Sequence, residues 1–243
     1  MHKVTYTGQS NGFGVISFMM NSAHMSLKPW IDRVMPVLLK APWLEISAEA
    51  WKIVRKLAQG MADEGIYEVL EHEATLELKD VQGKRAQVRK RQRVRYLQHN
   101  IIAYQDQAWG DGEILLNYRC TPGVEADRYQ AGHKTHILIS LREAKGRGDI
   151  DEFKIEWEFR NGFVRSQEEW GSEVSHRTKA LALQIIFPKS RPPQRVWLVE
   201  QLSRRTHLLP LGAIRQLGNG RWLVLWKTQR PRLHESYHLK WEW

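Results

Sequence analysis

The sequence predicts an α+β protein that is mainly β, with a short N-terminal helical segment followed by a large antiparallel β-sandwich or barrel. Hydrophobic residues recur at helical spacing only in the first third of the chain, and from Leu70 onward they alternate with polar residues. Turn-forming pairs such as Asn161-Gly162 separate the alternating stretches, which favours antiparallel sheets over a parallel α/β sheet. The expected divisions are an N-terminal tail or edge strand (1–25), a helical segment (26–66) and a sandwich-like domain (67–243).

The clearest helix is expected after Ser47, which can cap the stretch AEAWKIVRKLAQGMADEG before Gly65 ends it. A shorter helix can begin at Ser26, and Pro36 should kink or end it. The tripeptide His24-Met25-Ser26 is typical of a cloning junction. Residues 1–24 are therefore either appended sequence or a native first strand, and both interpretations stay open.

Strands are predicted where β-branched and aromatic residues alternate with polar ones. Six such stretches follow the first 100 residues: Thr135 to Leu141, Phe153 to Phe159, Ala180 to Phe187, Val196 to Val199, Arg221 to Trp226 and Tyr237 to Trp243. Most of the eleven tryptophans lie in such stretches, where the commonest use of the side chain is to fill the core between two sheets. The last strand is expected to dock into that core.

A hairpin is predicted from Leu70 to Tyr96, with Val81-Gln82-Gly83 as its loop and Gly83 in the left-handed conformation. If Asp80 pairs with Lys84, Glu73 faces Arg91 and Glu71 faces Arg93 on the outward face of the sheet. Opposite charges directly across an antiparallel pair contribute up to about 1 kcal/mol. This ladder would set the register of the two strands more than their stability.

The stretch KRAQVRKRQRVRYL, residues 84 to 97, therefore supports two interpretations: a solvated charge ladder, or a face that binds polyanions. Arg85, Arg89 and Arg95 are expected to lack acidic partners, so they would carry the binding. A basic loop, Lys145-Gly-Arg147, adds to the second interpretation. The candidate nucleic-acid-binding residues are Arg85, Arg89, Lys90, Arg91, Arg93, Arg95, Lys145 and Arg147.

Composition narrows the class of protein. The chain has 243 residues and a formal net charge of +10, which favours polyanionic partners without identifying a site. Cys120 is the only cysteine, so an intrachain disulfide and a cysteine-rich zinc cluster are excluded, and we expect a cytoplasmic protein. Apolar stretches such as VISFMM are too short for a spanning helix, so no membrane insertion is expected.

Candidates for catalysis are sparse. His133 and His136 have the residue types of metal ligands, but no third ligand is adjacent, and Cys120 precedes a turn with no identifiable base. The set Asp106, Asp111, Glu113, Glu152 and Lys154 is similar to the metal-binding pattern of PD-(D/E)xK nucleases. No phosphate loop or dinucleotide fingerprint is present. We therefore expect no cofactor and no metal, assign no catalytic residue and identify no small-molecule substrate.

Residues 204 to 226, RRTHLLPLGAIRQLGNGRWLVLW, resemble a segment of bacterial WYL regulatory domains, which follow a winged-helix DNA-binding domain. The resemblance covers about a tenth of the chain, Leu223 stands where that family has tyrosine, and we do not adopt it. It would imply a winged-helix-like region over residues 26 to 80, with the hairpin as its wing.

Three functions remain open. The favoured one is a non-catalytic β-rich binding module that regulates or scaffolds through a protein partner. The alternative is a nucleic-acid-binding regulator that uses the arginine-rich hairpin together with Arg191, Arg195, Arg204 and Arg205. The third is a metal-dependent nuclease built on Asp111, Glu152 and Lys154.

Overall fold

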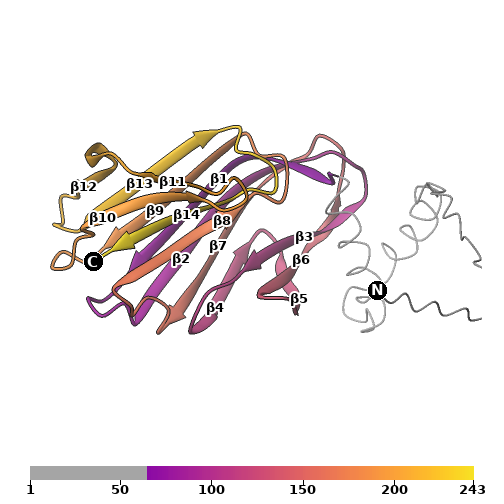
Figure 1. Cartoon of the computed structure of the whole chain (residues 1–243). Helices are drawn as coiled ribbons and strands as arrows, with labels where there is room; N and C mark the ends of the chain where they lie inside the picture. The colour runs from indigo at the N-terminus through magenta and orange to yellow at the C-terminus, as the bar shows by residue number, and fades with distance from the viewer. Residues whose placement is uncertain (1–64) are drawn as a thin grey trace, which may run out of the picture. The chain divides into compact units, whose positions relative to one another are not determined.

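The computed structural model describes residues 65–243. They form a mainly β structure of three sheets (Figure 1), and within them no helix has the length and apolar content that crossing a bilayer requires. The seven-stranded sheet contains, in spatial order, β12 (Ile214–Gln216), β13 (Trp222–Gln229), β9 (Ala180–Phe187), β1 (Tyr67–Leu78), β2 (Arg85–Tyr96), β7 (Ile150–Arg160) and β4 (Glu113–Thr121). The four-stranded sheet contains β11 (Arg205–Leu208), β10 (Arg195–Glu200), β14 (Ser236–Glu242) and β8 (Gln167–Glu173). The three-stranded sheet contains β3 (Ile101–Ala108), β6 (Lys134–Lys145) and β5 (Val124–Ala131), and a 3-10 turn, η1, spans Leu211–Ala213.

The six strands predicted after the first 100 residues correspond to β6, β7, β9, β10, β13 and β14. The sequence pattern missed β3, β4, β5, β8, β11 and β12, where polar residues and glycine blur the alternation. Both predicted helices, and the division of residues 1–66 into tail and helical segment, concern positions that lie almost wholly outside the described residues.

The prediction of purely antiparallel sheets is wrong at one place. β1 and β9 pair in parallel, with Ala74 opposite Leu183 and Leu76 opposite Ile185. About a hundred residues, including seven other strands, lie between these two strands, so the chain can return to the same end of the sheet before β9 begins. Both strands are buried on the inner face, where Leu76, Leu183 and Ile185 have no exposed surface.

The hairpin of β1 and β2 has the predicted register: Thr75 pairs with Arg89, Glu73 with Arg91 and Glu71 with Arg93. Gly83 in the loop has a φ of 70°, as expected. A bulge between Val69 and Glu71 then shifts the register by one residue. Before the bulge the inward residues of β1 are therefore odd-numbered, and after it they are even-numbered.

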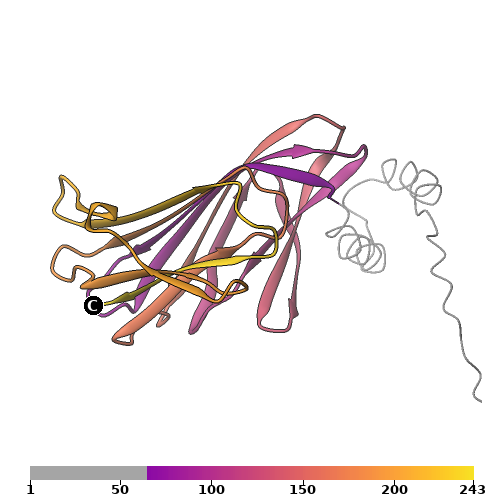
Figure 2. The same cartoon turned by 45° about the horizontal axis from the view of Figure 1, so that its top comes forward.

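The main core lies between the seven-stranded and four-stranded sheets, which face each other in Figures 1 and 2. Phe153, Ile155, Trp157 and Phe159 of β7 are all buried, as the alternation predicted. From the opposite sheet, Trp241 of β14 is fully buried and its ring packs edge-on against Phe187 of β9, 5.6 Å between centroids. The C-terminal strand is thus part of the core.

Candidate functional site

The arginine strand β2 presents its odd-numbered side chains on the outer face of the seven-stranded sheet, and each of its five arginines has a carboxylate within 4 Å. Arg91 has three: its Nη2 lies 2.8 Å from Glu71 Oε2 and 2.9 Å from Glu73 Oε1, and its Nη1 lies 3.1 Å from Glu152 Oε2. Hydrogen bonds from Arg91 to Glu73 and Glu71 raise the pKa of Arg91. The strand is therefore the middle row of a charge ladder between β1 and β7.

The expectation that Arg85, Arg89 and Arg95 lack acidic partners is wrong. Arg85 Nε lies 3.8 Å from Asp80 Oδ2, and Arg89 Nη2 lies 2.9 Å from Glu77 Oε2. Arg95 Nη1 lies 3.0 Å from Glu68 Oε1, because the bulge in β1 shifts the register and brings Glu68 opposite Arg95. A hairpin without the bulge would have placed no acid there.

The other predicted polyanion-binding residues do not join this face. Lys90 points inward, and its side chain is 11% exposed. Lys145 is held by two acids, with its Nζ 3.2 Å from Asp151 Oδ1 and also bonded to Glu143, and these hydrogen bonds raise the pKa of Lys145. Arg147 is exposed in the loop before β7, where its backbone N–H donates to His99 Nδ1.

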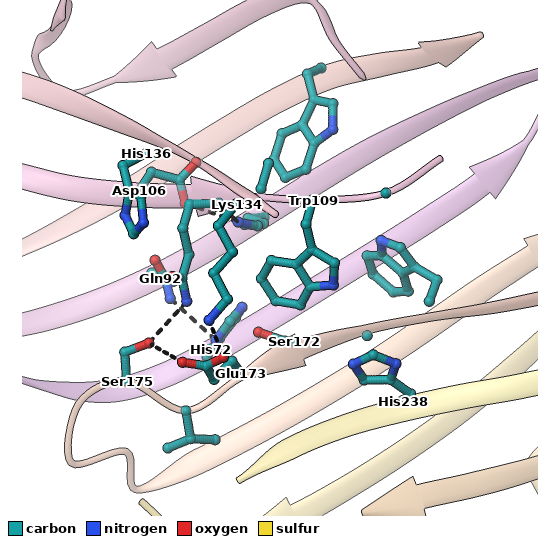
Figure 3. Close-up of a pocket in the computed structure, with 18 of the residues that line it drawn as sticks. His72, Gln92, Asp106, Trp109, Lys134, His136, Ser172, Glu173, Ser175 and His238 are labelled. Carbon is teal, nitrogen blue, oxygen red and sulfur yellow. Dashed lines mark hydrogen bonds and ion pairs between the residues drawn. The ribbon is translucent and has the colours of Figure 1, made fainter. Parts of the chain in front are cut away.

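A cavity of about 500 Å³ lies where the three sheets meet. Its walls come from β1, β2 and β7 of the large sheet, from β3 and the start of β6, and from β8 and β14 of the four-stranded sheet. Figure 3 shows Lys134 and His136 entering from one side and Ser172 and His238 from the other. No sequence motif marked this site, because its residues come from seven strands and from several of the loops that connect strands.

A buried ion pair lies in the wall of the cavity. Lys90 Nζ lies 2.9 Å from Asp106 Oδ1 and also donates to the carbonyl of Gln107, 2.8 Å away. Asp106 is 3% exposed and accepts a second hydrogen bond from Tyr118 Oη at 3.2 Å. The Lys90 ammonium also lies 4.7 Å from the centroid of the Trp157 ring. Each charge is thus compensated where it is removed from water.

A second polar chain crosses from β3 to β1. Tyr104 Oη donates to Gln92 Oε1, and Gln92 Nε2 donates to His72 Nδ1 at 3.2 Å. His72 is 6% exposed, and burial together with the nearby Lys90 charge lowers its pKa to about 3. His72 is therefore neutral at physiological pH, and because Nδ1 accepts, its proton lies on Nε2.

On the opposite side, Lys134 forms an ion pair with Glu173, and the Trp109 ring lies beside it, 5.5 Å from the Lys134 ammonium to the ring centroid (Figure 3). Ser175 Oγ joins this group by donating to Glu173 Oε1 and accepting from Gln107 Nε2 at 2.9 Å. This network connects β3, β6 and β8, and it holds the side chains of Lys134 and Glu173 in place.

The other sequence candidates lie apart from one another. His133 is exposed in the turn before β6, whereas His136 is half-buried at the cavity and its Nδ1 is hydrogen-bonded to Gln105 Nε2 at 2.7 Å. Cys120 is half-buried in β4, and burial raises the pKa of its thiol. Within residues 65–243, no group of three His, Cys, Asp or Glu side chains is arranged to hold a metal ion.

The nuclease-like acids are not gathered either. Asp111 is exposed and paired with Arg165 at 2.8 Å, and it precedes β4 near the end of β7 that contains Arg160. Glu152 and Lys154 lie toward the other end of β7, and Glu152 is eight positions along the extended strand from Arg160, about 26 Å. Glu113 is exposed at the start of β4 and paired with Arg160, whereas Asp106 is inside the cavity with Lys90.

Neither a family model nor a curated protein matches this chain. The short resemblance of residues 204 to 226 to WYL domains is thus not accompanied by a family match. That segment folds as β11, η1, β12 and the start of β13, at the edges of two sheets.

Proposed function

We propose that this chain is a non-catalytic β-sandwich-like binding module that regulates or scaffolds through a protein partner, and that the partner docks along the edge formed by β11 and β12. The observation that carries the proposal is a pair of exposed apolar side chains, Leu208 at the end of β11 and Leu211 in the turn η1 that leads to β12. Leu208 is 62% exposed and Leu211 is 88% exposed. In the described part of the chain, β11 pairs only with β10, and β12 only with β13.

Charge favours an acidic partner segment. Residues 188–234 contain ten lysines and arginines and a single acid, Glu200, so nearly all of the chain's net charge comes from this segment. Arg204, Arg205 and Arg215 of this segment are exposed, within a few residues of the two leucines in sequence. An extended acidic segment with apolar side chains could add to the edge through backbone hydrogen bonds and place those side chains on the leucines.

The test is a pull-down with the full chain from nuclease-treated lysate, comparing the wild type with Leu208→Asp/Leu211→Asp. A matched control, Leu97→Asp/Val164→Asp, changes two other exposed apolar side chains, at 37% and 51% exposure, in turns away from β11 and β12. A protein retained by the wild type and the control but lost from the edge variant supports the proposal. Equal retention by all three chains places the partner elsewhere.

Nucleic acid is the second candidate, because the same basic segment would attract phosphates as well as acidic peptides. On this hypothesis the arginine ladder contributes less than residues 188–234, since glutamates surround the ladder's guanidinium groups. Binding should weaken steeply with salt through release of counterions. Fluorescence anisotropy with labelled duplex DNA and single-stranded RNA at two salt concentrations measures this dependence.

A further inference from the structure

The outer edge of β11 is regular and unpaired. Its pairing with β10 runs without a register shift from Arg205, opposite Glu200, to Leu208, opposite Trp197, and all four of its residues are exposed. Among the other sheet edges of residues 65–243, β4 and β5 are interrupted by register shifts, β12 has three residues, and β3 and β8 line the cavity. Because bulges and coverage protect an edge from further pairing, β11 is the described edge most open to an added strand.

The hydrogen-bond pattern shows which backbone groups of β11 point away from β10. In an antiparallel pair, residues that bond to the partner strand alternate with residues whose N–H and C=O point outward. The Leu209 N–H donates to the Val196 carbonyl of β10 at 2.8 Å and continues the register of β11 by one residue. Counting back in steps of two, the odd-numbered residues of β11 bond to β10. The N–H and C=O of Thr206 and Leu208 therefore point outward, and within residues 65–243 they make no hydrogen bond.

The side chains of β11 divide between the two faces of the four-stranded sheet. Residues directly opposite each other share a face. His207 is opposite Leu198, whose side chain is buried in the core, so His207 and Arg205 lie on the inner face and Thr206 and Leu208 on the outer face. A strand added to β11 would alternate in the same way, with every second side chain beside the two basic residues.

Charge selects the side chains that would face Arg205 and His207. Among residues 65–243, Arg204 and Arg205 have no carboxylate within 4 Å, in contrast to the five arginines of β2. His207 has one acid nearby, with its Nε2 3.9 Å from Glu200 Oε2. These basic groups would attract the acidic side chains of an added strand. A second copy of this chain would bring the same positive charge and be repelled, so the charge favours a different, acidic chain.

The outward backbone groups decide between a peptide and a nucleic acid. Thr206 and Leu208 each offer one donor and one acceptor, and the backbone of an extended peptide carries partners for both. A phosphate group can accept from the two N–H groups but donates nothing to the two carbonyls. The exposed Leu208 side chain also favours an apolar side chain as its neighbour.

We infer that the partner's docking segment is an extended strand that adds to β11 in antiparallel orientation, the orientation of every pair within the four-stranded sheet. Acidic and apolar side chains alternate in this segment: the acids lie opposite Arg205 and His207, and the apolar residues lie opposite Thr206 and Leu208. The apolar residues exchange both backbone hydrogen bonds with Thr206 and Leu208. The inference rests on the proposed function, because it specifies how the protein partner uses the same edge.

The test is isothermal titration calorimetry of the full chain with a short peptide of alternating glutamate and valine. A peptide of the same composition, with the glutamates in one block and the valines in another, controls for the pattern. Two N-methylated forms of the alternating peptide are a matched pair. Methylated valines lose the N–H groups that donate to β11, whereas methylated glutamates lose N–H groups on the far edge. We expect the first form to bind about tenfold more weakly and the second within about twofold of the parent peptide.

On the protein, Thr206→Pro removes the outward N–H of residue 206, which a sheet edge tolerates because that N–H faces solvent. Thr206→Ala is the matched control, since it shortens the side chain and keeps the N–H. We expect Thr206→Pro to bind the alternating peptide about tenfold more weakly than Thr206→Ala. Amide hydrogen exchange gives a readout in the unchanged chain: the peptide should slow exchange at Thr206 and Leu208 and leave His207, which already bonds to β10, nearly as it was.

The inference is overturned if the alternating peptide does not bind, if the block peptide binds as tightly, if the two methylated peptides or the two Thr206 variants bind equally, or if exchange at Leu208 is unchanged. Binding of duplex DNA in place of the alternating peptide would also overturn it and assign the edge to phosphates. The pull-down separates this failure from that of the proposed function. A partner lost from Leu208→Asp/Leu211→Asp but retained by Thr206→Pro would overturn strand addition and leave the proposed function standing.

Discussion

Lys90 and Asp106 form an ion pair, 2.9 Å from Nζ to Oδ1, that joins the seven-stranded sheet to the three-stranded sheet with both side chains nearly inaccessible to solvent. The sequence pattern made Lys90 a candidate for binding polyanions, and it placed Asp106 in the set of acids that is similar to the PD-(D/E)xK pattern. Each instead neutralises the other, so both have a structural role in the cavity wall.

Removing one member of this pair should therefore be costly. We expect Lys90→Met to lower the free energy of unfolding by about 3–5 kcal/mol, since it leaves the Asp106 carboxylate buried and unpaired. The double variant Lys90→Met/Asp106→Leu should lose less than the sum of the single changes. As a control, Arg160→Met breaks an exposed pair with Glu113 and should cost less than about 1 kcal/mol. Urea unfolding of the wild type and these variants measures the differences, and a Lys90→Met variant as stable as Arg160→Met would contradict the structural role of the pair.

Stability should fall in mild acid because of buried histidine. Burial lowers the pKa of His72 to about 3 and that of His176 to about 4, whereas both take up protons near pH 6.5 when unfolded. The unfolded chain therefore binds more protons below pH 6.5, and the stabilisation present above that pH is lost as the pH falls. Between pH 6.5 and 5, His72 alone should contribute a slope of up to about 1.4 kcal/mol per pH unit.

The variant His72→Gln should reduce that slope, and His207→Gln, which changes a histidine 58% exposed, serves as its control. Measurement above pH 5 avoids the pH range in which carboxylates with a lowered pKa, such as Glu77, lose their stabilisation. Burial raises the pKa of Glu77 but hydrogen bonds from Lys79 and Arg221 bring it down to about 2, so its stabilisation is lost only at lower pH, below about 4.5. Equal slopes for His72→Gln and the wild type from pH 6.5 to 5 would show that His72 is not a buried neutral side chain.

The hairpin loop should not tolerate a side chain at Gly83. A Cβ atom there would lie 1.7 Å from the carbonyl oxygen of Phe163, and the φ of 70° adds backbone strain. Gly132 has a similar φ of 62° and open space around it, so Gly132→Ala measures the strain alone, about 1–2 kcal/mol. We expect Gly83→Ala to cost more than Gly132→Ala in chemical unfolding, because the backbone at Phe163 must move. Equal costs would mean that the backbone at Phe163 relaxes freely.

The two arginine regions can be separated if the chain binds nucleic acid. Arg204→Glu/Arg205→Glu should weaken binding and reduce the dependence of log K on log salt by about 1 for each phosphate that the protein no longer neutralises. Arg89→Glu/Arg95→Glu should have the smaller effect, since Glu77 and Glu68 already neutralise those arginines. Anisotropy titrations at low and physiological salt compare the pairs. If Arg89→Glu/Arg95→Glu weakened nucleic-acid binding more than Arg204→Glu/Arg205→Glu, the arginine strand β2 would be the binding face.

Local pattern alone was enough for several features. The alternation of Phe153, Ile155, Trp157 and Phe159 predicted a buried face, and the Gly83 turn with the flanking charges predicted the pairing of Glu73 with Arg91. These features can be predicted from nearby residues, since successive side chains of a strand point to opposite faces of the sheet. The same alternation predicted that the C-terminal strand docks into the core, where Trp241 is fully buried.

Tertiary structure decided the rest. The bulge after Val69 shifts the register and places the Glu68 carboxylate opposite Arg95. The parallel pairing of β1 with β9 requires the chain to return to the same end of the sheet after about a hundred residues. The ion pair of Lys90 with Asp106 joins residues of two different sheets. The cavity combines side chains from seven strands and from loops between strands. Which of its buried nitrogens lack a hydrogen-bond partner depends on the positions of all the side chains around them. The sequence by itself thus determined the inward face of β7, of β14 and of β1 after its bulge. Only the packing of three sheets decided which side chains meet, because contacts between sheets have no fixed spacing in sequence.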